Sequence, residues 1–435
     1  MKKSEEKQDG GRLQAVKGMR DLLPPDSRRL AAIERLAHEM LQSQGYFPVH
    51  TPIVEYTPLF ARSIGEETDI VEKEMYTFED RDGRSLTLRP EGTAGVVRAY
   101  NEHALHKAEP VTLWYYIGPM FRHERWQRGR YRQFYQLGVE ALGVADPGID
   151  AEMLSMLVDL LLKVGLPAES MELHLNSLGC PVCRPTHRKA LLDYLAPRAG
   201  ELCEDCQRRF GQNPLRVLDC KVPGCRAIAV GAPTTLDLLC GDCRTHWDGL
   251  VSALGALDLE HQVDHRLVRG LDYYSRTTFE LISNSGNLGS QNTVAGGGRY
   301  DGLVALMGGP PTPAVGFAMG LERLLLALGD TELPPQVEVA FVTQGDAARL
   351  AALPLARALR RRGVRVDVDH RGSSMKSQMK RANRLGAGVV LILAERELER
   401  GVVALRQMKS SEQSEVPGDE VVERVLQLSQ QGKPD

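Results

Sequence analysis

The first clear hydrophobic pattern along the chain covers residues 26 to 44. Apolar side chains recur there at three- and four-residue spacing, which places them on one face of a helix. These residues are Leu30, Ile33, Leu36, Ala37, Met40 and Leu41. Pro24 and Pro25 end the preceding segment, and Asp26 or Ser27 can cap the helix. We therefore predict a helix whose apolar face packs in a core.

Residues 49 to 166 combine short β-rich runs with helical stretches. The β-rich runs cover 86–88, 112–117 and 135–139, and the last helical stretch covers 149–164. Because the strands do not alternate regularly with long helices, the pattern predicts an antiparallel α+β domain.

The composition changes over residues 167–260. This region holds all eight cysteines, from Cys180 to Cys243, and several short helical stretches. Residues 261–330 then return to strand-like runs and glycine turns. The pattern predicts one domain in two parts, 12–166 and 261–330, separated by a Cys-rich insertion.

Beyond Pro334 and Pro335, β and α patterns alternate. Short runs typical of buried strands cover 337–342, 364–368 and 389–393, and helical runs cover 346–362 and 374–386. Regular alternation of this kind is typical of a small three-layer domain with a largely parallel sheet. We expect this α/β domain to occupy residues 336–435.

Composition fits a soluble globular protein of two or three folded units, with 435 residues, 42% apolar and 26% charged. The formal charge of −3 argues against a protein that coats nucleic acid or membrane through charge alone. Residues 1–11 form a polar tail, expected to be flexible, without the apolar core of a signal peptide. No membrane-spanning helix is expected. We expect a cytoplasmic protein.

Arginines concentrate in the segment from Phe121 to Phe134, with five of them in eleven residues. If 115–124 and 133–140 are paired strands, Arg122 and Glu124 share one face of the first, and Gln136, Gly138 and Glu140 share one face of the second. Gly138 would let a ligand lie close to the sheet. A solvated hairpin with a basic tip is the alternative, but arginines in this number suit phosphate groups.

Other segments place polar side chains beside glycines. Residues 87–93 bring a carboxylate and a hydroxyl next to Gly92, an arrangement that can bind an ammonium group or form a simple turn. Residues 267–274 set an arginine and two tyrosines around Gly270, and a glycine-rich loop follows at 295–302. Phosphate-binding G-x-x-x-x-G-K-[ST] and G-x-G-x-x-G motifs do not occur, so a nucleotide would need another cradle.

Taken together these segments resemble the histidyl-tRNA synthetases, a family of class II aminoacyl-tRNA synthetases. Residues 121–134 resemble class II motif 2, and 316–324 resemble motif 3. Residues 267–274 and 295–303 resemble the two histidine-specific signatures. The resemblance implies a class II catalytic domain with an antiparallel sheet and a C-terminal anticodon-binding domain. It also implies a homodimer, with the N-terminal helix and first domain at the interface.

The resemblance implies three sets of site residues. The histidine-binding set is Glu91, Gly92, Thr93, Arg122, Gln136, Glu140, Arg269, Tyr273 and Tyr274. The ATP-binding set is Arg122, Glu124 and Arg323, and the tRNA-binding set is Arg125, Gln127, Arg128, Arg130, Lys376 and Arg381. Trp126 stands where the family commonly has proline in the motif 2 loop. That departure concerns the tip of the loop.

Within these sets the resemblance gives each position a role. Arg122 holds the α-phosphate and the histidine carboxylate, and Arg323 holds the triphosphate. Glu91, Thr93 and Gln136 receive the α-ammonium group, while Glu140 and Tyr274 read the imidazole nitrogens. Arg269 lies beside the α-phosphate, where other class II enzymes place a metal ion. The catalytic residues are therefore Arg269, Arg122 and Arg323, since fixed cations stabilise charge that develops at phosphorus.

The implied reaction is ATP-dependent activation of L-histidine to histidyl-adenylate, with Mg²⁺ on the leaving pyrophosphate, and transfer to the 3′ end of tRNA(His). One alternative is a catalytically silent paralogue that regulates histidine biosynthesis by binding a phosphoribosyltransferase. Such paralogues lack the C-terminal domain and degrade the signature positions, whereas this chain keeps both. A class II synthetase for another amino acid is disfavoured by the 267–274 signature together with Glu140.

The cysteines of the insertion predict structural zinc independently of the resemblance. Three C-x-x-C pairs occur, at Cys180 and Cys183, Cys203 and Cys206, and Cys240 and Cys243, and Cys220 with Cys225 forms a looser pair. The 19-residue spacer between the first two pairs is usual for zinc. Eight thiolates would fill two closed sites. Spacing leaves the pairing open, His187 or His246 could replace a cysteine, and free thiols are the alternative.

The C-terminal region is basic where it is predicted to be helical. Ten Arg or Lys lie between Arg357 and Arg384, against Asp367 and Asp369. A solvated helix face is the simple interpretation for one such helix. Two neighbouring basic runs favour a track for nucleic-acid phosphates, here the anticodon stem.

Overall fold

The computed structural model describes residues 13–65, 68, 70–211, 213–285, 288, 292–330 and 337–431. The chain divides into two compact units, Met1–Thr331 and Glu332–Asp435. The predicted tail at 1–11 and the prolines 334 and 335 lie outside the described residues.

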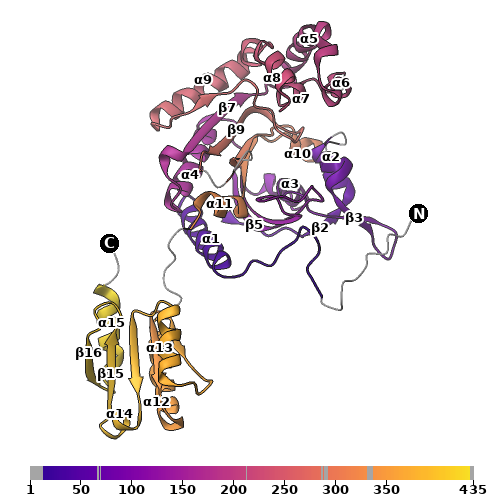
Figure 1. Cartoon of the computed structure of the whole chain (residues 1–435). Coiled ribbons are helices and arrows are strands. Elements are labelled where there is room, and N and C mark those ends of the chain that lie inside the picture. Colours follow the sequence, from indigo (N-terminus) through magenta and orange to yellow (C-terminus); the bar gives the residue numbers. More distant parts are fainter. Residues whose placement is uncertain are drawn as a thin grey trace. The chain divides into compact units, whose positions relative to one another are not determined.

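An eight-stranded sheet forms the centre of the first unit, with the strand order β1-β5-β6-β11-β10-β9-β7-β8 (Figure 1). Its strands are β1 (Phe47–Pro48), β5 (Thr112–Phe121), β6 (Gln133–Leu142), β7 (Met171–Ser177), β8 (Gln262–Val263), β9 (Ser275–Ser283), β10 (Thr293–Arg299) and β11 (Ala314–Gly320). Neighbouring strands are antiparallel except at the two edges, where β1 pairs with β5 and β7 with β8 in parallel. The predicted antiparallel α+β class is confirmed.

Helices cover both faces of this sheet. The main core joins one face to α1 (Asp26–Ser43), α4 (Gly148–Lys163), α9 (Gly241–Ala256) and α11 (Leu321–Leu328). A smaller core on the other face includes α3 (Thr93–Glu102) and α10 (Leu303–Leu306). Along β6, Leu137 and Val139 enter the main core, so Gln136 and Glu140 face the opposite side. The polar alternation expected for this strand is present.

A small three-stranded sheet, in the order β2-β4-β3, packs beside α3. It consists of β2 (Val54–Tyr56), β3 (Tyr76–Glu79) and β4 (Ser85–Leu88), with α2 (Thr57–Ile64) next to it. The strand β4 leads directly into the turn that carries Glu91 and into α3.

The Cys-rich region contains short helices around a core of its own. These helices are α5 (Arg184–Leu195), α6 (Glu204–Phe210), α7 (Leu215–Leu218) and α8 (Pro223–Val230), followed by α9. The strand β7, which the sequence places at the start of the predicted insertion, belongs to the eight-stranded sheet. The helical part of the insertion therefore begins after Ser177.

The second unit is a five-stranded sheet between two helical layers, with the strand order β13-β12-β14-β15-β16. Its strands are β12 (Val339–Thr343), β13 (Val366–Val368), β14 (Val389–Leu393), β15 (Val402–Gln407) and β16 (Gln413–Pro417). Its helices are α12 (Asp346–Arg361), α13 (Met375–Arg384), α14 (Glu395–Glu399) and α15 (Val421–Gln431). One apolar cluster includes residues of α12 and α15, and another includes residues of α13.

The predicted parallel pattern covers only part of this sheet. The strands β12, β13 and β14 are parallel, while β15 and β16 add an antiparallel hairpin that the sequence did not predict. Within the described parts of both units, no helix is long and apolar enough to span a membrane.

Candidate active site

A cavity of about 230 Å³ lies on the face of the large sheet that α3 covers in part. Its wall takes residues from the β4–α3 turn, the β5–β6 hairpin, the segment before β9, and β10, β11 and α11. The predicted residues in the wall are Glu91, Arg122, Glu124, Arg130, Gln136, Arg269, Tyr273, Tyr274 and Arg323. The fold thus brings together side chains that are more than 200 positions apart in the sequence.

Glu91 holds its carboxylate at the start of α3. Its two oxygens accept hydrogen bonds from the backbone N–H groups of Thr93 at 2.7 Å and Ala94 at 2.9 Å. Burial raises the pKa of Glu91, and these N–H donors oppose that rise. The carboxylate is therefore fixed at the cavity wall by the first turn of the helix.

Arg122 lies just beyond the end of β5. Its Nε donates to the carbonyl oxygen of Pro90 at 2.8 Å, and its guanidinium lies 5.4 Å from the ring centre of Phe134. Because Glu91 follows Pro90 directly, the contact with Pro90 places the guanidinium of Arg122 next to Glu91. Glu124 forms an ion pair with Arg130 at 3.3 Å across the same hairpin.

The tip of the hairpin turns at Gly129, which has a φ of +77° that favours glycine. Arg125, Gln127 and Arg128 are exposed there, and Trp126 is also exposed. Of the residues predicted to meet tRNA in this loop, Arg130 alone is also part of the cavity wall.

Arg269 is fixed by a carboxylate that sequence reasoning missed. Its Nη1 donates to Oε1 of Glu280 on β9, and Thr293 donates to the other oxygen of Glu280 at 3.0 Å. A Cβ atom built on Gly296 would lie 2.5 Å from Arg269 Nη1. The glycine-rich strand β10 therefore leaves the space that the guanidinium occupies.

Arg323 completes a group of cations around the cavity. Its Nη1 donates to the carbonyl oxygen of Thr293 at 2.8 Å. Burial, and then the positive charges of Arg130 and Arg122, lower the pKa of Arg323. The arginines repel one another, and an anionic ligand between them would relieve that repulsion.

Gln136 offers an unused acceptor at the wall. It is only 8% exposed, and its Oε1 has no hydrogen-bond donor among the described residues. A buried amide oxygen without a partner is costly. A donor on a bound ligand, such as an ammonium group, would satisfy it.

Thr93 and Glu140 are not part of the cavity wall; they lie behind it and contact the residues that form it. Thr93 Oγ1 donates to Glu140 Oε1 at 2.7 Å, and Tyr300 donates to Oε2 at 2.5 Å. Burial raises the pKa of Glu140 to about 8, although both hydroxyl donors oppose the rise. Tyr300 was part of a predicted segment, but its bond to Glu140 was not predicted.

The interpretation of Gly138 was wrong. A Cβ on Gly138 would lie 2.1 Å from the ring of Tyr116, and a Cβ on Gly92 would lie 2.2 Å from the same ring. The protein's own tyrosine thus fills the space that was expected for a ligand. Tyr116 is the direct cross-strand partner of Gly138. A large ring opposite a glycine was the sequence signal that the protein itself fills this space.

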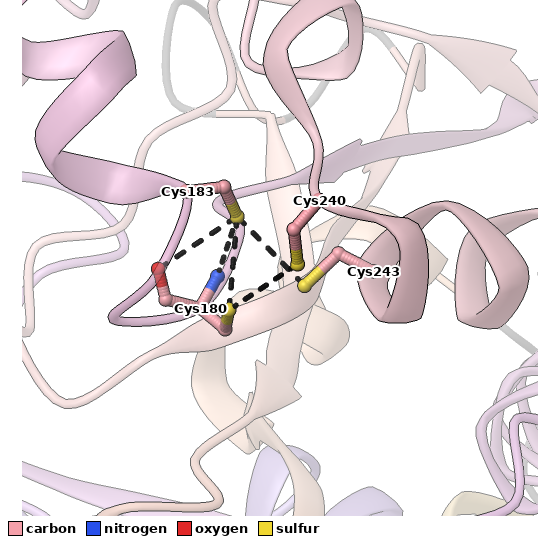
Figure 2. A group of neighbouring side chains, drawn as sticks. All are labelled: Cys180, Cys183, Cys240 and Cys243. Carbon is pink, nitrogen blue, oxygen red and sulfur yellow. Dashed lines mark hydrogen bonds between the residues drawn. The ribbon is translucent and has the colours of Figure 1, made fainter.

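The eight cysteines form two groups of four, each within 4.8 Å. The base tetrad is Cys180, Cys183, Cys240 and Cys243, and it joins the end of β7 to the start of α9 (Figure 2). The outer tetrad is Cys203, Cys206, Cys220 and Cys225. Spacing had left this pairing open.

Sulfur geometry fits a tetrahedral metal site. The Sγ–Sγ distances are 3.7 Å for Cys180–Cys240 and 3.8 Å for Cys183–Cys243, and Cys203–Cys220 is also 3.8 Å. A tetrahedral zinc with bonds of about 2.3 Å needs sulfurs about 3.8 Å apart. A disulfide needs about 2.05 Å. The thiols are therefore free and spaced as closed Cys₄ ligands.

Neither candidate histidine belongs to a tetrad. His187 contacts the carbonyl oxygen of Pro233 at 2.9 Å and Thr235 Oγ1 at 3.2 Å. His246 Nε2 lies 3.6 Å from Asp150 Oδ2. His187 is thus hydrogen-bonded away from the sulfurs, and His246 Nε2 faces Asp150 without a hydrogen-bond partner among the described residues.

The second unit places its predicted residues on α13. Lys376 is exposed and lines a hollow with residues that follow β12 and β13. Arg381 forms a two-pronged ion pair with Asp367, at 2.8 and 2.9 Å. That pair neutralises Arg381 locally, so the free positive charge is smaller than the sequence count suggests.

Comparison with known proteins gives a consistent result. The model of the family described as histidyl-tRNA synthetase matches residues 18–324, and that of an anticodon binding domain matches 336–428. The histidine–tRNA ligase of Syntrophotalea carbinolica is 49% identical over 416 residues, covering 95% of this chain and 98% of the relative. That of Desulfatibacillum aliphaticivorans is 50% identical over 424 residues, covering 97% and 100%.

A solved structure agrees with these relatives. The crystal structure of apo histidyl-tRNA synthetase from S. aureus is 36% identical, with a TM-score of 0.79. The match covers 95% of this chain and 100% of that one.

Proposed function

The chain belongs to the histidyl-tRNA synthetase family, and from this premise we propose how its cavity carries out the reaction of a histidine–tRNA ligase. It is an aminoacyl-tRNA ligase with the class II fold. The observation that carries the residue assignment is the convergence of Arg122, Arg269 and Arg323, from three separate segments, on one cavity that also holds Glu91.

Glu91, Gln136 and Thr93 bind the α-ammonium group of histidine. The carboxylate of Glu91 supplies the charge, and the unused Oε1 of Gln136 supplies a neutral acceptor. Thr93 orients the region because its N–H and hydroxyl bind Glu91 and Glu140. Gly92 allows the close approach of the Tyr116 ring behind them.

Glu140 and Tyr274 read the imidazole ring, with Tyr273 beside them. The ring centres of Tyr273 and Tyr274 are 4.7 Å apart. Thr93 and Tyr116 donate to Oε1 of Glu140 and Tyr300 donates to Oε2, which leaves Oε2 a further lone pair for a ring N–H. An apolar side chain of the same shape would lack the donor and acceptor nitrogens of the imidazole ring, so it would bind much more weakly.

Adenylate formation needs no covalent enzyme intermediate. A carboxylate oxygen of histidine attacks the α-phosphorus of MgATP, the bond to the bridging oxygen breaks, and pyrophosphate leaves with its magnesium. Arg122 orients the carboxylate against the α-phosphate, and Arg269 stabilises the charge at phosphorus. Arg323 and Glu124 hold the rest of the nucleotide. Catalysis is thus mainly positioning and charge stabilisation.

Transfer then gives histidyl-tRNA. A hydroxyl of the terminal ribose attacks the acyl carbon, and AMP leaves. The exposed Arg125, Gln127 and Arg128, together with Arg130, are placed to contact the acceptor end. Lys376 and Arg381 are assigned to the anticodon stem, which the match to an anticodon binding domain supports.

Two further features belong to this proposal. The tetrads each hold a structural zinc ion, which supplies a rigid tetrahedral cross-link when it is bound. The active form is a homodimer, because the N-terminal segment and first domain expose large apolar side chains. These include Leu13, Val16, Leu23, Phe47 and Tyr56.

Exchange of labelled pyrophosphate into ATP tests the function. Histidine should support exchange, and the other amino acids should not. A synthetase for a different amino acid would respond to that amino acid instead. A silent regulatory paralogue, which no observation on this chain favours, would show no exchange with any of them.

A further inference from the structure

The segment that carries Arg269, Tyr273 and Tyr274 is held by the insertion. We name residues 267–274 the recognition loop; it connects β8 to β9 and, within these described residues, has no helix or strand. At its end, Arg184 Nη2 donates to the carbonyl oxygen of Tyr274 at 2.7 Å. Nearer its start, Arg216 Nη1 donates to the carbonyl oxygen of Arg269 at 3.1 Å. Both donors come from insertion helices, α5 and α7.

Arg184 is linked to the base tetrad, because it is the residue that follows Cys183. Two backbone hydrogen bonds join the same segments. Arg276 N–H donates to the carbonyl oxygen of Gly179 at 2.8 Å, and Leu178 N–H donates to the carbonyl oxygen of Arg276 at 2.7 Å. Gly179 has a φ of +66°, and a Cβ there would lie 2.6 Å from the Cys183 sulfur. The sulfur cluster therefore lies directly against the chain that leaves the recognition loop.

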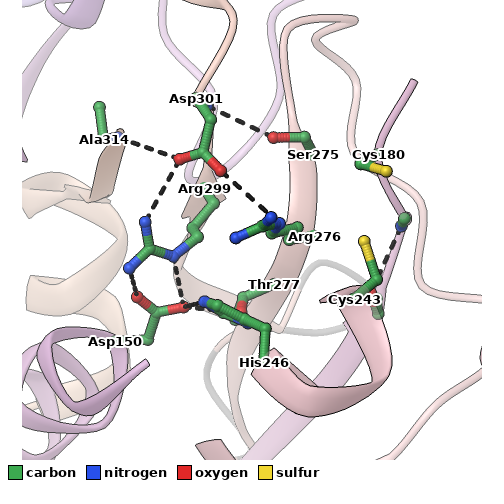
Figure 3. A network of polar contacts seen from close by, with 12 residues as sticks. Asp150, Cys180, Cys243, His246, Ser275, Arg276, Thr277, Arg299, Asp301 and Ala314 are labelled. Carbon is green, nitrogen blue, oxygen red and sulfur yellow. Dashed lines mark hydrogen bonds and ion pairs between the residues drawn. The ribbon is translucent and has the colours of Figure 1, made fainter. Parts of the chain in front are cut away.

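The other half of the base tetrad is tied to the sheet. Cys240 and Cys243 begin α9, and His246 on the next turn lies 3.6 Å from Asp150. Asp150 in turn binds Arg299 at 2.8 Å and accepts a bond from Thr277 at 2.7 Å (Figure 3). A metal in the base tetrad would thus join α5 to α9, and α9 contacts this buried network through His246, without a hydrogen bond to Asp150.

The outer tetrad holds the second contact. Arg216 lies between Cys206 and Cys220, on the four-residue helix α7. Val268 of the recognition loop packs against the apolar cluster that contains Cys206 and Cys225. Helices as short as α6, α7 and α8, with 7, 4 and 8 residues, are marginal on their own, so their positions depend on their small apolar core and on cross-links.

We propose that zinc in the two tetrads positions the recognition loop through Arg184 and Arg216, so that histidine affinity depends on metal occupancy. The inference rests on the proposed function, because it assumes that the cavity binds histidine. It gives the metals a task in substrate binding beyond stabilising the insertion. Arg184 and Arg216 are positioning residues in this scheme, since they act on backbone atoms of the loop.

The direct test leaves every cysteine in place. Arg184→Met and Arg216→Met should retain two zinc ions per chain but raise the KM for histidine about ten-fold each, as expected when one charge-assisted hydrogen bond is lost. The KM for ATP should change less than two-fold in both variants, and kcat less than two-fold in Arg184→Met. Arg216→Met should also lower kcat, because Arg216 holds the backbone of the catalytic Arg269. Arg184→Lys should restore part of the loss. The matched control is Arg208→Met, which removes an exposed insertion arginine paired with Asp205 and should leave all values unchanged.

Metal loss should reproduce the effect of the arginine substitutions. Cys243→Ser should lower the zinc content to about one ion per chain and raise the KM for histidine. If that effect passes through Arg184, adding Arg184→Met to Cys243→Ser should raise the KM little further. Full additivity of the two effects would overturn the proposal.

Reciprocity gives a readout other than activity. Coupling is mutual, so a ligand in the histidine site must tighten zinc binding by the factor with which zinc tightens the ligand. The amount of zinc released at equilibrium to a competing chromogenic chelator should be measured with and without a stoichiometric acyl-sulfamate analogue of histidyl-adenylate, because free histidine would itself bind zinc. The analogue should reduce the zinc released from the parent chain and not that released from the double variant Arg184→Met/Arg216→Met.

The experiments distinguish a wrong positioning role from a wrong proposed function. Zinc-loaded protein without histidine-dependent exchange would remove the premise. Active protein whose KM for histidine is unchanged in both arginine variants, or whose zinc release ignores the analogue, would overturn the positioning role. A folded, active chain purified without any metal would overturn it as well.

Discussion

At the scale of single residues, Arg269 is held by Glu280 and given room by Gly296, the cross-strand neighbour of Glu280. Its place in the 267–274 signature could be predicted from the sequence. Glu280 could not, because a lone glutamate on a strand carries no distinct signal and its partner lies in the loop before that strand. The same holds for Tyr116, which fills the space above Gly138. Contacts between strands decide such details, and a linear pattern does not contain them.

Arg269→His tests the charge at phosphorus. Imidazole is neutral over most of the physiological range, so it cannot replace a permanent cation. We expect adenylate formation to slow about 10²-fold or more, the scale for one lost transition-state donor. Pyrophosphate exchange measures the rate, and circular dichroism checks that the fold is intact. A variant with the parent rate would remove Arg269 from the catalytic residues.

Glu140→Gln tests the buried carboxylate through pH. Burial raises the pKa of Glu140 from 4.5 to about 8, so the folded state keeps a proton that the unfolded chain loses earlier. Its contribution to the free energy of unfolding is therefore highest below about pH 4.5 and falls as the pH rises to about 8. The variant should lose this part of the pH dependence.

Urea unfolding at pH 5.5 and pH 8.5 measures that difference. All three tryptophans, Trp114, Trp126 and Trp247, lie in the first unit and report on it. Asp150 and Glu322 also have raised pKa values, about 6 and about 7, but they are present in both proteins. An identical pH dependence in parent and variant would contradict the assignment.

At the scale of elements, periodic patterns gave good predictions where one face is buried. The predicted helix at 26–44 is α1, Asp26–Ser43, and the predicted strand at 389–393 is β14. The edge strand β16 was missed because its exposed polar residues resemble a loop, and the inner strand β15, with buried Val403, Ala404 and Leu405, was also missed. The strand β7 was grouped with the cysteines, although the turn residue Gly179 separates it from Cys180. The grouping of the cysteines into two tetrads could not be predicted from their spacing, because it depends on the three-dimensional structure.

Strand β6 offers a matched pair of substitutions. Leu137 is fully buried in the main core, whereas its neighbour Gln136 faces the cavity. Leu137→Ala should lower the free energy of unfolding by about 2–5 kcal/mol. Gln136→Ala should change it by less than about 1 kcal/mol but raise the KM for histidine. Urea unfolding and pyrophosphate exchange of both variants check this, and equal loss of stability would contradict the strand alternation.

At the scale of the whole molecule, activation and tRNA recognition are assigned to different units. The cavity lies in the first unit, and Lys376 and Arg381 lie in the second. Neutralisation of Arg381 by Asp367 shows why a charge count from sequence overstated the basic track. The match to an anticodon binding domain supports the assignment of this unit.

Deletion of residues 336–435 tests that division. The truncated chain keeps every residue of the cavity, so histidine-dependent pyrophosphate exchange should be largely retained. Charging of tRNA should fall much further, because the contacts to the anticodon stem are lost. Parallel assays on the same preparation give both values. Equal loss of the two activities would count against separate roles for the units.

The most direct measurement is charging itself. Purified protein, ATP, magnesium, labelled histidine and total bacterial tRNA should give acid-precipitable label on one tRNA acceptor, released by mild base as expected for an ester. The same reaction with Arg323→Ala should give far less product, since the triphosphate loses its cation. Histidine attached to a single tRNA species is the predicted result; no charging, or charging with another amino acid, would contradict it.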